Sequence, residues 1–298
     1  MTLTESLTDA GFGLGWSVAK AMPEGMVDGL FRAAADRAWR RQGPGVRQLR
    51  ANLSRVLDDD RIVDLDEIAH EGMRRYMRYW CEAFLLPSWN DARVTASFRL
   101  GEGLDLLDAA VASGKGAIMV SPHSGNWDLA AAWASHRYGG IVTVAERLKP
   151  EGLYDRFVAY RESLGMEVFP LGDPSVLRQL ARRLREGKLV CLLADRDISG
   201  TGVDVDFFGE PASMPAGPAV LSLLTGAPIM PVTLWHVADG VDGRVGTALA
   251  IPSEGDRAAR IQVITQTIAD VFARDIHAHP EDWHMMQPLW AADLEQYA

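Results

Sequence analysis

The sequence predicts an α/β fold, in which a central and mostly parallel sheet is flanked by helices and preceded by a helical N-terminal region. From residue 115 onward, apolar runs of strand length alternate with segments of helical periodicity, as is typical of parallel strands joined by helices. Before residue 110, apolar side chains recur at helical spacing instead. We therefore expect one domain over 1–298, with a helical region at 1–110 and an α/β core at 115–290.

The N-terminal region is expected to be helical from about residue 16 to residue 110. Its clearest helical run is EIAHEGMRRYMRYWCEAFLL, residues 67–86. One face of this run carries Met73, Tyr76, Trp80 and Phe84, whereas Arg74, Arg75 and Arg78 lie off that face. Pro87 should end the helix, because proline cannot continue the hydrogen-bond ladder.

Six short apolar runs are expected to form the strands of the core. They are AIMVS (117–121), IVTVA (141–145), EVFPL (167–171), LVCLLA (189–194), IMPVTLW (229–235) and TALAIP (247–252). Helices are expected from about 127, over 151–164, over 174–187, within 214–226 and over about 255–276. VDVDFFGEP (203–211) is expected to form a turn and a strand.

Charge is unevenly distributed along the chain. The net charge of −10 argues against a general nucleic-acid-binding protein. Residues 15–55 nevertheless hold eight basic and three acidic side chains, together with several aromatic and other apolar ones. Such a segment either associates with an anionic membrane surface or packs on the core with a solvated basic face. No apolar run reaches the roughly 18 residues of a membrane-spanning helix.

Ionisable residues follow three of the predicted strands at the point where each one ends. His123 follows 117–121, Glu146 and Arg147 follow 141–145, and Asp195 and Arg196 follow 189–194. The carboxyl ends of parallel strands meet at one edge of a sheet, where ligands usually bind. These side chains are therefore expected to converge on one site.

His123 has the sequence context of a general base. A histidine titrates near neutral pH, and a carboxylate on one ring nitrogen fixes its tautomer and stabilises the imidazolium. Asp128, five residues later, is expected in the first turn of the next helix and able to fold back towards His123. PHSGN does not match the G-x-S-x-G nucleophile motif, and Ser124 is expected to cap that helix.

Three blocks, in order, resemble the lipid A late acyltransferase family of the glycerolipid acyltransferase superfamily. PHSGNWD (122–128) resembles its H-x4-D/E block, LLADRDISGTGVDVDFFG with MPAGPA (192–219) its second block, and HPEDWHMMQPLW (279–290) its C-terminal block. HSGNWD, TVAERLKPEGLYDRFVAYRESLG (143–165) and DWHMMQP are most similar to the phosphatidylinositol mannoside acyltransferases within that family.

The resemblance implies transfer of a long-chain acyl group, typically palmitoyl, from acyl-CoA to the 6-hydroxyl of a mannose on phosphatidylinositol mannoside. It implies a peripheral protein on the cytoplasmic face of the plasma membrane, with no metal or other cofactor. His123 matches the family's general base, Asp128 its H-x4-D acid, and Asp195 an acid of the charge relay, here in place of the usual glutamate. Arg161 and Thr201 match positions near the acyl donor.

Several assignments stay open on the sequence alone. Glu146 and Arg147 either bind the acceptor or lie in a solvated loop, and Arg196 either faces the donor phosphates or forms a structural ion pair. His284 is expected to serve packing. Alternative functions are a lipid A-type or other glycolipid or lysophospholipid acyltransferase with a different donor or acceptor, a non-catalytic lipid-binding protein, and a hydrolase.

Overall fold

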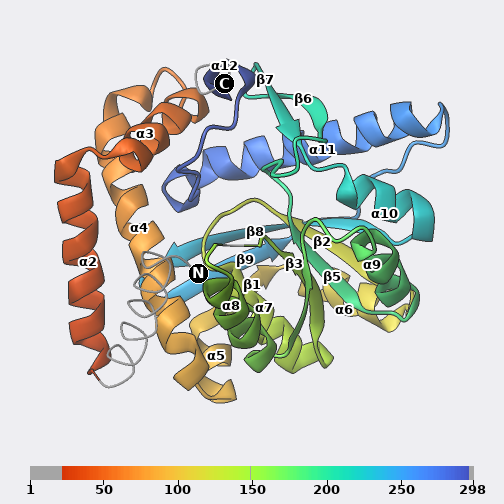
Figure 1. The fold of residues 1–298 in the computed structure, drawn as a ribbon, viewed down its shortest axis with the longest axis horizontal. Coiled ribbons are helices and arrows are strands. Elements are labelled where there is room, and N and C mark those ends of the chain that lie inside the picture. The colour runs from red at the N-terminus through yellow and green to blue at the C-terminus, as the bar shows by residue number, and fades with distance from the viewer. Residues whose placement is uncertain (1–21, 148, 295–298) are drawn as a thin grey trace.

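The sheet of this α/β protein has seven strands, in the order β1–β9–β8–β2–β5–β3–β4 (Figure 1). The computed structural model describes residues 22–147 and 149–294. The strands of the sheet are β1 (Phe98–Glu102), β2 (Ala117–Ser121), β3 (Ile141–Ala145), β4 (Met166–Pro170), β5 (Leu189–Leu193), β8 (Ile229–Val237) and β9 (Gly240–Val245). All neighbours pair in parallel except β8 and β9, which form an antiparallel hairpin. The predicted mostly parallel sheet is therefore confirmed.

Helices flank this sheet on both faces and at one end (Figure 1). They are α2 (Glu24–Arg41), α3 (Pro44–Val56), α4 (Leu65–Leu85), α5 (Asp91–Ser97), α6 (Leu104–Ala112), α7 (Trp127–Tyr138), α8 (Glu151–Ser163), α9 (Val176–Arg185), α10 (Gly217–Thr225), α11 (Arg257–Ala278) and α12 (Ala291–Leu294). Three short 3₁₀ turns are η1 (Ile62–Asp64), η2 (Leu86–Ser88) and η3 (Pro280–Asp282). A separate hairpin joins β6 (Val203–Phe207) to β7 (Glu210–Met214).

Two apolar cores lie on opposite faces of the sheet, as the alternation along β2 illustrates. Ile118 and Val120 face the core that α9, α10 and α11 cover, whereas Ala117 and Met119 face the core under α6, α7 and α8 (Figure 1). All four side chains are almost fully buried, which is why β2 is an uninterrupted apolar run. The strand is thereby held rigidly at the centre of the sheet, directly before His123.

Two strand predictions were wrong. Residues 98–102, expected to be helical, form β1, because Phe98 is buried against Trp133 and the backbone pairs with β9. Residues 247–252, expected to be a strand, have no regular strand structure. The turn at residues 238–239 instead brings residues 240–245 back beside β8. Tertiary pairing thus overrides the local apolar pattern in both places.

The N-terminal helices stand at one end of the sheet, with α2 packed along α4 (Figure 1). As predicted, α4 ends at Leu85, just before Pro87. Met26 and Leu30 of α2 are each 58% exposed. Among the described residues no helix is both long enough and apolar enough to cross a membrane. Residues 15–21 of the basic segment lie outside the described residues.

Candidate active site

His123 and Asp195 meet because they occupy matching positions beyond two neighbouring strands. Ser121 of β2 pairs with Leu193 of β5. His123 and Asp195 each follow two residues after these paired positions. His123 Nδ1 lies 2.5 Å from Asp195 Oδ1, and the His123 backbone N–H donates to Asp195 Oδ2 at 2.9 Å. Parallel strands of equal register thus bring together two residues that are 72 positions apart.

The Asp195 carboxylate is held in its ionised form. It is fully buried, whereas the His123 side chain is 25% exposed. Burial raises the pKa of Asp195, but the electrostatic attraction to the His123 ring and the hydrogen bonds from His123 and Trp283 outweigh it, so the pKa lies below its ordinary value. A buried anion on Nδ1 keeps the proton on that nitrogen and leaves Nε2 as the basic nitrogen. Within the described residues, no hydrogen bond to Nε2 is found.

The turn that carries His123 is shaped by Gly125 and Asn126. Gly125 has a φ of +60°, and an added Cβ would lie 2.8 Å from the Leu234 carbonyl carbon, so only glycine fits. Asn126 caps α7 by accepting from the Leu129 N–H at 2.9 Å. The expectation that Ser124 caps this helix was wrong, because Ser124 lies further from the helix and forms a β-bridge with Trp283.

Asp128 lies in the first turn of α7, as expected, but its carboxylate is not bonded to His123. It accepts from Arg161 Nε at 2.9 Å and from the Tyr79 hydroxyl at 2.9 Å. Asp128 is almost fully buried and Arg161 is only 16% exposed. Burial lowers the pKa of Arg161, but the Asp128 charge outweighs it and raises the value. The structure therefore brings His123 to Asp195 and Asp128 to Arg161.

Two adjoining cavities open beside these pairs. The larger, about 570 Å³, is lined by His123, Arg161, Arg196 and Thr201 as well as by Glu146. The smaller, about 110 Å³, is lined almost entirely by apolar side chains of the sheet and α7. Trp127 and Arg161 line both cavities. A polar ligand part near His123 and an apolar chain behind Trp127 could therefore occupy neighbouring spaces.

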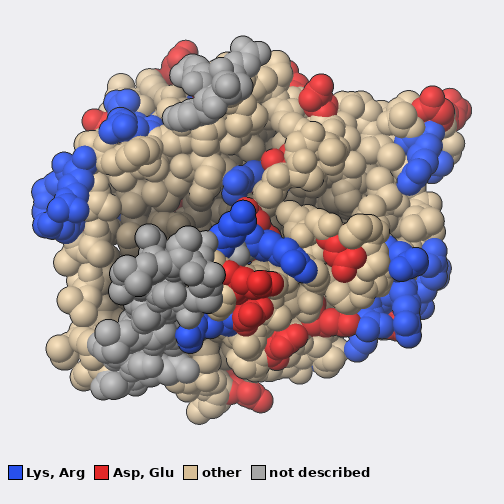
Figure 2. Space-filling view, in the orientation of Figure 1, with Lys and Arg blue, Asp and Glu red and all other residues tan. Residues whose placement is uncertain are grey.

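Of the remaining predicted site residues, Glu146, Arg196 and Thr201 line the larger cavity. Arg196 Nη1 lies 3.9 Å from Glu146 Oε2, a distance at the outer limit of an ion pair. Arg147 lies over the Tyr154 ring at 6.0 Å and is not part of the cavity lining. The Thr201 hydroxyl is 2.8 Å from Ser199 Oγ. Figure 2 shows basic and acidic side chains intermixed near the middle of this face. Among the described residues, no cluster of His, Cys, Asp or Glu is arranged to hold a metal ion.

Sequence reasoning missed several residues that contact the His123 turn. Trp283 Nε1 donates to Asp195 Oδ2 at 2.9 Å, and the His284 backbone N–H donates to the His123 carbonyl at 2.8 Å. His236, for which the sequence indicated no partner, lies with Asp282 and Glu82. The signal that could have indicated these contacts was the DWH triplet at 282–284, in which three side chains able to form hydrogen bonds follow one another.

The chain is similar over nearly its whole length to known acyltransferases. The model of the bacterial lipid A biosynthesis acyltransferase family matches residues 3–292. A phosphatidylinositol mannoside acyltransferase of Mycolicibacterium smegmatis is 47% identical over 295 residues, which cover 97% of this chain and 93% of that protein. A protein of the same name from Mycobacterium tuberculosis is 47% identical over 298 residues, covering 99% of this chain and 92% of its own.

Proposed function

Because the chain belongs to the bacterial lipid A biosynthesis acyltransferase family and is a glycolipid acyltransferase, we propose a specific reaction for it. It moves a long-chain acyl group, palmitoyl, from acyl-CoA to the 6-hydroxyl of a mannose on phosphatidylinositol mannoside. The identity of 47% over nearly the full length of relatives named for this acceptor supports the choice of acceptor. The acyl-CoA donor rests on the sequence resemblance.

The observation that carries the proposal is the His123–Asp195 pair at the wall of the larger cavity. In the proposed mechanism, His123 Nε2 takes the proton of the sugar hydroxyl while the hydroxyl oxygen attacks the thioester carbonyl. Asp195 holds the Nδ1–H and stabilises the imidazolium that forms. The tetrahedral intermediate then collapses, the carbon–sulfur bond breaks, and His123 returns its proton to the departing thiolate.

Asp128 takes a supporting role in this proposal. Its carboxylate fixes the Arg161 guanidinium at the boundary of the two cavities, where a cation suits the phosphates or the thioester carbonyl of the donor. Tyr79 donates to the second carboxylate oxygen, so both oxygens of Asp128 are occupied. Asp128 therefore acts through Arg161 rather than through His123.

In the same proposal, the two cavities bind different parts of the substrates. The apolar cavity behind Trp127 receives the acyl chain, since a hydrocarbon gains free energy on leaving water. The larger cavity receives the polar parts, with Glu146, Arg196 and Thr201 available for the sugar and the donor. The first residues of α10 line the larger cavity as well.

The N-terminal helices supply the proposed contact with the cytoplasmic face of the membrane. Met26 and Leu30 are exposed on α2, and the last turn of that helix carries Arg40 and Arg41. Figure 2 shows a basic patch at the outer end of the N-terminal helices. Exposed apolar side chains and arginines on one helix favour an anionic lipid surface.

Product analysis tests the reaction. The protein is incubated with palmitoyl-CoA and phosphatidylinositol mannoside, and the lipids are separated and analysed by mass spectrometry. We expect a monoacylated product from this acceptor and none from its 6-deoxymannose analogue. Acylation of the 6-deoxy analogue would contradict the assigned hydroxyl. Release of free thiol without an acylated lipid would identify a hydrolase instead. Transfer only from acyl carrier protein would identify the lipid A-type donor.

A further inference from the structure

The segment Asp282–His284 lies against the turn that carries His123 and is bonded to it through both backbones. The Gly125 N–H donates to the Asp282 carbonyl at 3.0 Å, and the His284 N–H donates to the His123 carbonyl at 2.8 Å. Between these two bonds, Ser124 and Trp283 form an antiparallel bridge. His284 Nε2 adds a contact of 3.0 Å with the Gly125 carbonyl. The turn is thereby held like one strand of a short hairpin, although the segment follows it by more than 150 residues.

Trp283 connects the same segment to the partner of His123. Its indole N–H donates to Asp195 Oδ2 at 2.9 Å, and its side chain is completely buried. One residue thus contacts the turn through its backbone and the buried carboxylate through its side chain. A shift of Trp283 would move His123 and Asp195 relative to each other.

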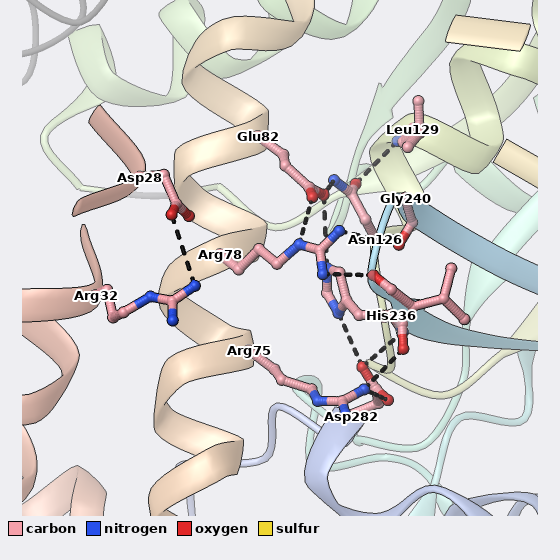
Figure 3. Close-up of polar contacts among 12 residues, drawn as sticks. Asp28, Arg32, Arg75, Arg78, Glu82, Asn126, Leu129, His236, Gly240 and Asp282 are labelled. Carbon is pink, nitrogen blue, oxygen red and sulfur yellow. Dashed lines mark hydrogen bonds and ion pairs between the residues drawn. The ribbon is translucent and has the colours of Figure 1, made fainter. Parts of the chain in front are cut away.

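Asp282 is fixed in turn by cations from two other elements (Figure 3). Its carboxylate accepts from Arg75 of α4 at 2.7 Å and from the backbone N–H of His236 in β8 at 2.9 Å. His236 Nδ1 is a further 2.8 Å contact to the same carboxylate. The Asp282 side chain is fully buried, so these groups replace its whole water shell.

Glu82 holds the other end of the turn. Its Oε2 accepts from Asn126 Nδ2 at 2.7 Å, and its Oε1 accepts from Arg78 Nε at 2.8 Å. His236 Nε2 lies 3.5 Å from Glu82 Oε2, which is an ion-pair distance rather than a hydrogen bond. The His236 ring therefore lies between two carboxylates, as Figure 3 shows. The Glu82 carboxylate holds the turn at Asn126, whereas Asp282 holds it at Gly125 through its backbone carbonyl.

The electrostatics of this cluster favour a protonated His236. Burial lowers the pKa of His236, but the two carboxylates outweigh it and raise the value above the ordinary one. Burial raises the pKa of Glu82, yet the His236 and Arg78 charges and the Asn126 hydrogen bond bring it down to about 2. The side chains of His236 and Asp282 are 1% and 0% exposed, so this ion pair is shielded from water.

We propose that Trp283 and His236 are positioning residues for the His123 turn. Trp283 sets the alignment of His123 with Asp195. His236 locks the carboxylates of Glu82 and Asp282, the two residues that hold the turn at Asn126 and Gly125. The inference rests on the proposed function, because it assigns these residues to the base of that reaction. Neither residue is expected to touch the substrates.

Trp283→Phe tests the inference, because it removes one N–H and keeps most of the ring. Trp290→Phe is a matched control, since Trp290 is equally buried and its indole N–H donates at 2.9 Å to the Phe207 carbonyl, which is not part of the site. We expect kcat of Trp283→Phe to fall about tenfold with KM within twofold, the size of one hydrogen bond to a charged group. Trp290→Phe should keep the wild-type kcat, with a similar fall in melting temperature.

Equal kcat values for the two variants would overturn the inference, as would a loss confined to KM. If Trp283→Phe fails to fold, benzothienylalanine at position 283 keeps the ring shape without the N–H and is expected to give the same tenfold loss. A second readout does not depend on activity: the NMR signal of the His123 Nδ1 proton should shift in Trp283→Phe and not in Trp290→Phe. Wild-type protein that acylates no glycolipid would refute the proposed function, whereas an unshifted signal would refute the positioning role alone.

Discussion

Asp195→Asn is the substitution whose effect the structure defines most closely. The Asp195 carboxylate accepts three hydrogen bonds, from His123 Nδ1, the His123 backbone N–H and Trp283 Nε1. An asparagine has a single acceptor oxygen, so its NH₂ group must face one of these donors. If the NH₂ faces Nδ1, the ring proton moves to Nε2 and the base is lost. If the NH₂ group instead faces the His123 backbone N–H and the Trp283 indole N–H, buried donors lie against each other without an acceptor.

The first arrangement has a large kinetic effect, because the wrong histidine tautomer cannot accept the proton of a hydroxyl. The corresponding exchange in a serine protease triad lowers kcat by about 10⁴-fold, or about 5.5 kcal/mol of transition-state stabilisation. The second arrangement costs about 1–3 kcal/mol of folding free energy for the opposed donors. We therefore expect kcat to fall by about 10³- to 10⁴-fold, with KM for both substrates nearly unchanged.

Steady-state kinetics with palmitoyl-CoA and phosphatidylinositol mannoside measure this effect. Thermal melting and circular dichroism of the variant serve as the control for folding. Asp195→Glu restores the carboxylate and should recover part of the lost rate. A folded Asp195→Asn protein with kcat within tenfold of the wild type would refute the reasoning, because the carboxylate would then not control the His123 tautomer.

Three further predictions follow from other contacts. His236→Gln should lower the melting temperature by roughly 10 °C at pH 6, the cost of breaking a buried ion pair. Because the folded-state pKa of His236 is raised, the stabilisation from its charge is full below the ordinary pKa and is lost as the pH rises through the folded-state value. A difference in melting temperature that stays constant from pH 6 to 9 would argue against a charged His236. Ala131→Leu narrows the apolar cavity and should shift the preferred donor to shorter chains in a competition between acyl-CoA lengths; an unchanged preference would place the chain elsewhere. Arg161→Ala leaves the buried Asp128 without its cation and should raise the KM for acyl-CoA at least tenfold, whereas a KM at the wild-type value would exclude donor binding by Arg161.

The parallel core of the fold was predictable because its strands are buried on both faces. Val120 and Val190, for example, are fully buried and lie in continuous apolar runs that have no other stable placement. β1 was not predictable, since only Phe98 of its five residues is buried and the strand depends on pairing with β9, more than 140 positions away. The segment 247–252 runs beside the start of β8, where the Leu249 N–H donates to the Ile229 carbonyl at 2.8 Å, but it forms no regular strand there.

In the site, too, contacts set by the strand pattern were predictable from the sequence, whereas contacts set by the packing of distant elements were not. The convergence of His123 and Asp195 on one edge was predictable from strand ends, because parallel strands end at the same edge. That Asp195 rather than Asp128 bonds to His123 was implied only by the family resemblance. The partner of Asp128 could not be predicted from spacing, since Arg161 comes from α8 and the angle between α7 and α8 decides which carboxylate it reaches. His236 lay beyond sequence reasoning altogether, because its partners come from α4 and η3.

The most direct measurement of the central claim is the rate of acyl transfer by His123→Ala, with palmitoyl-CoA as donor and phosphatidylinositol mannoside as acceptor. His123 supplies the only proposed base, and removing it leaves Asp195, Arg161 and both cavities in place. The account predicts a variant that melts close to the wild-type temperature, still binds the donor, and gives no acylated product. A folded His123→Ala protein that turns over at the wild-type rate would contradict it.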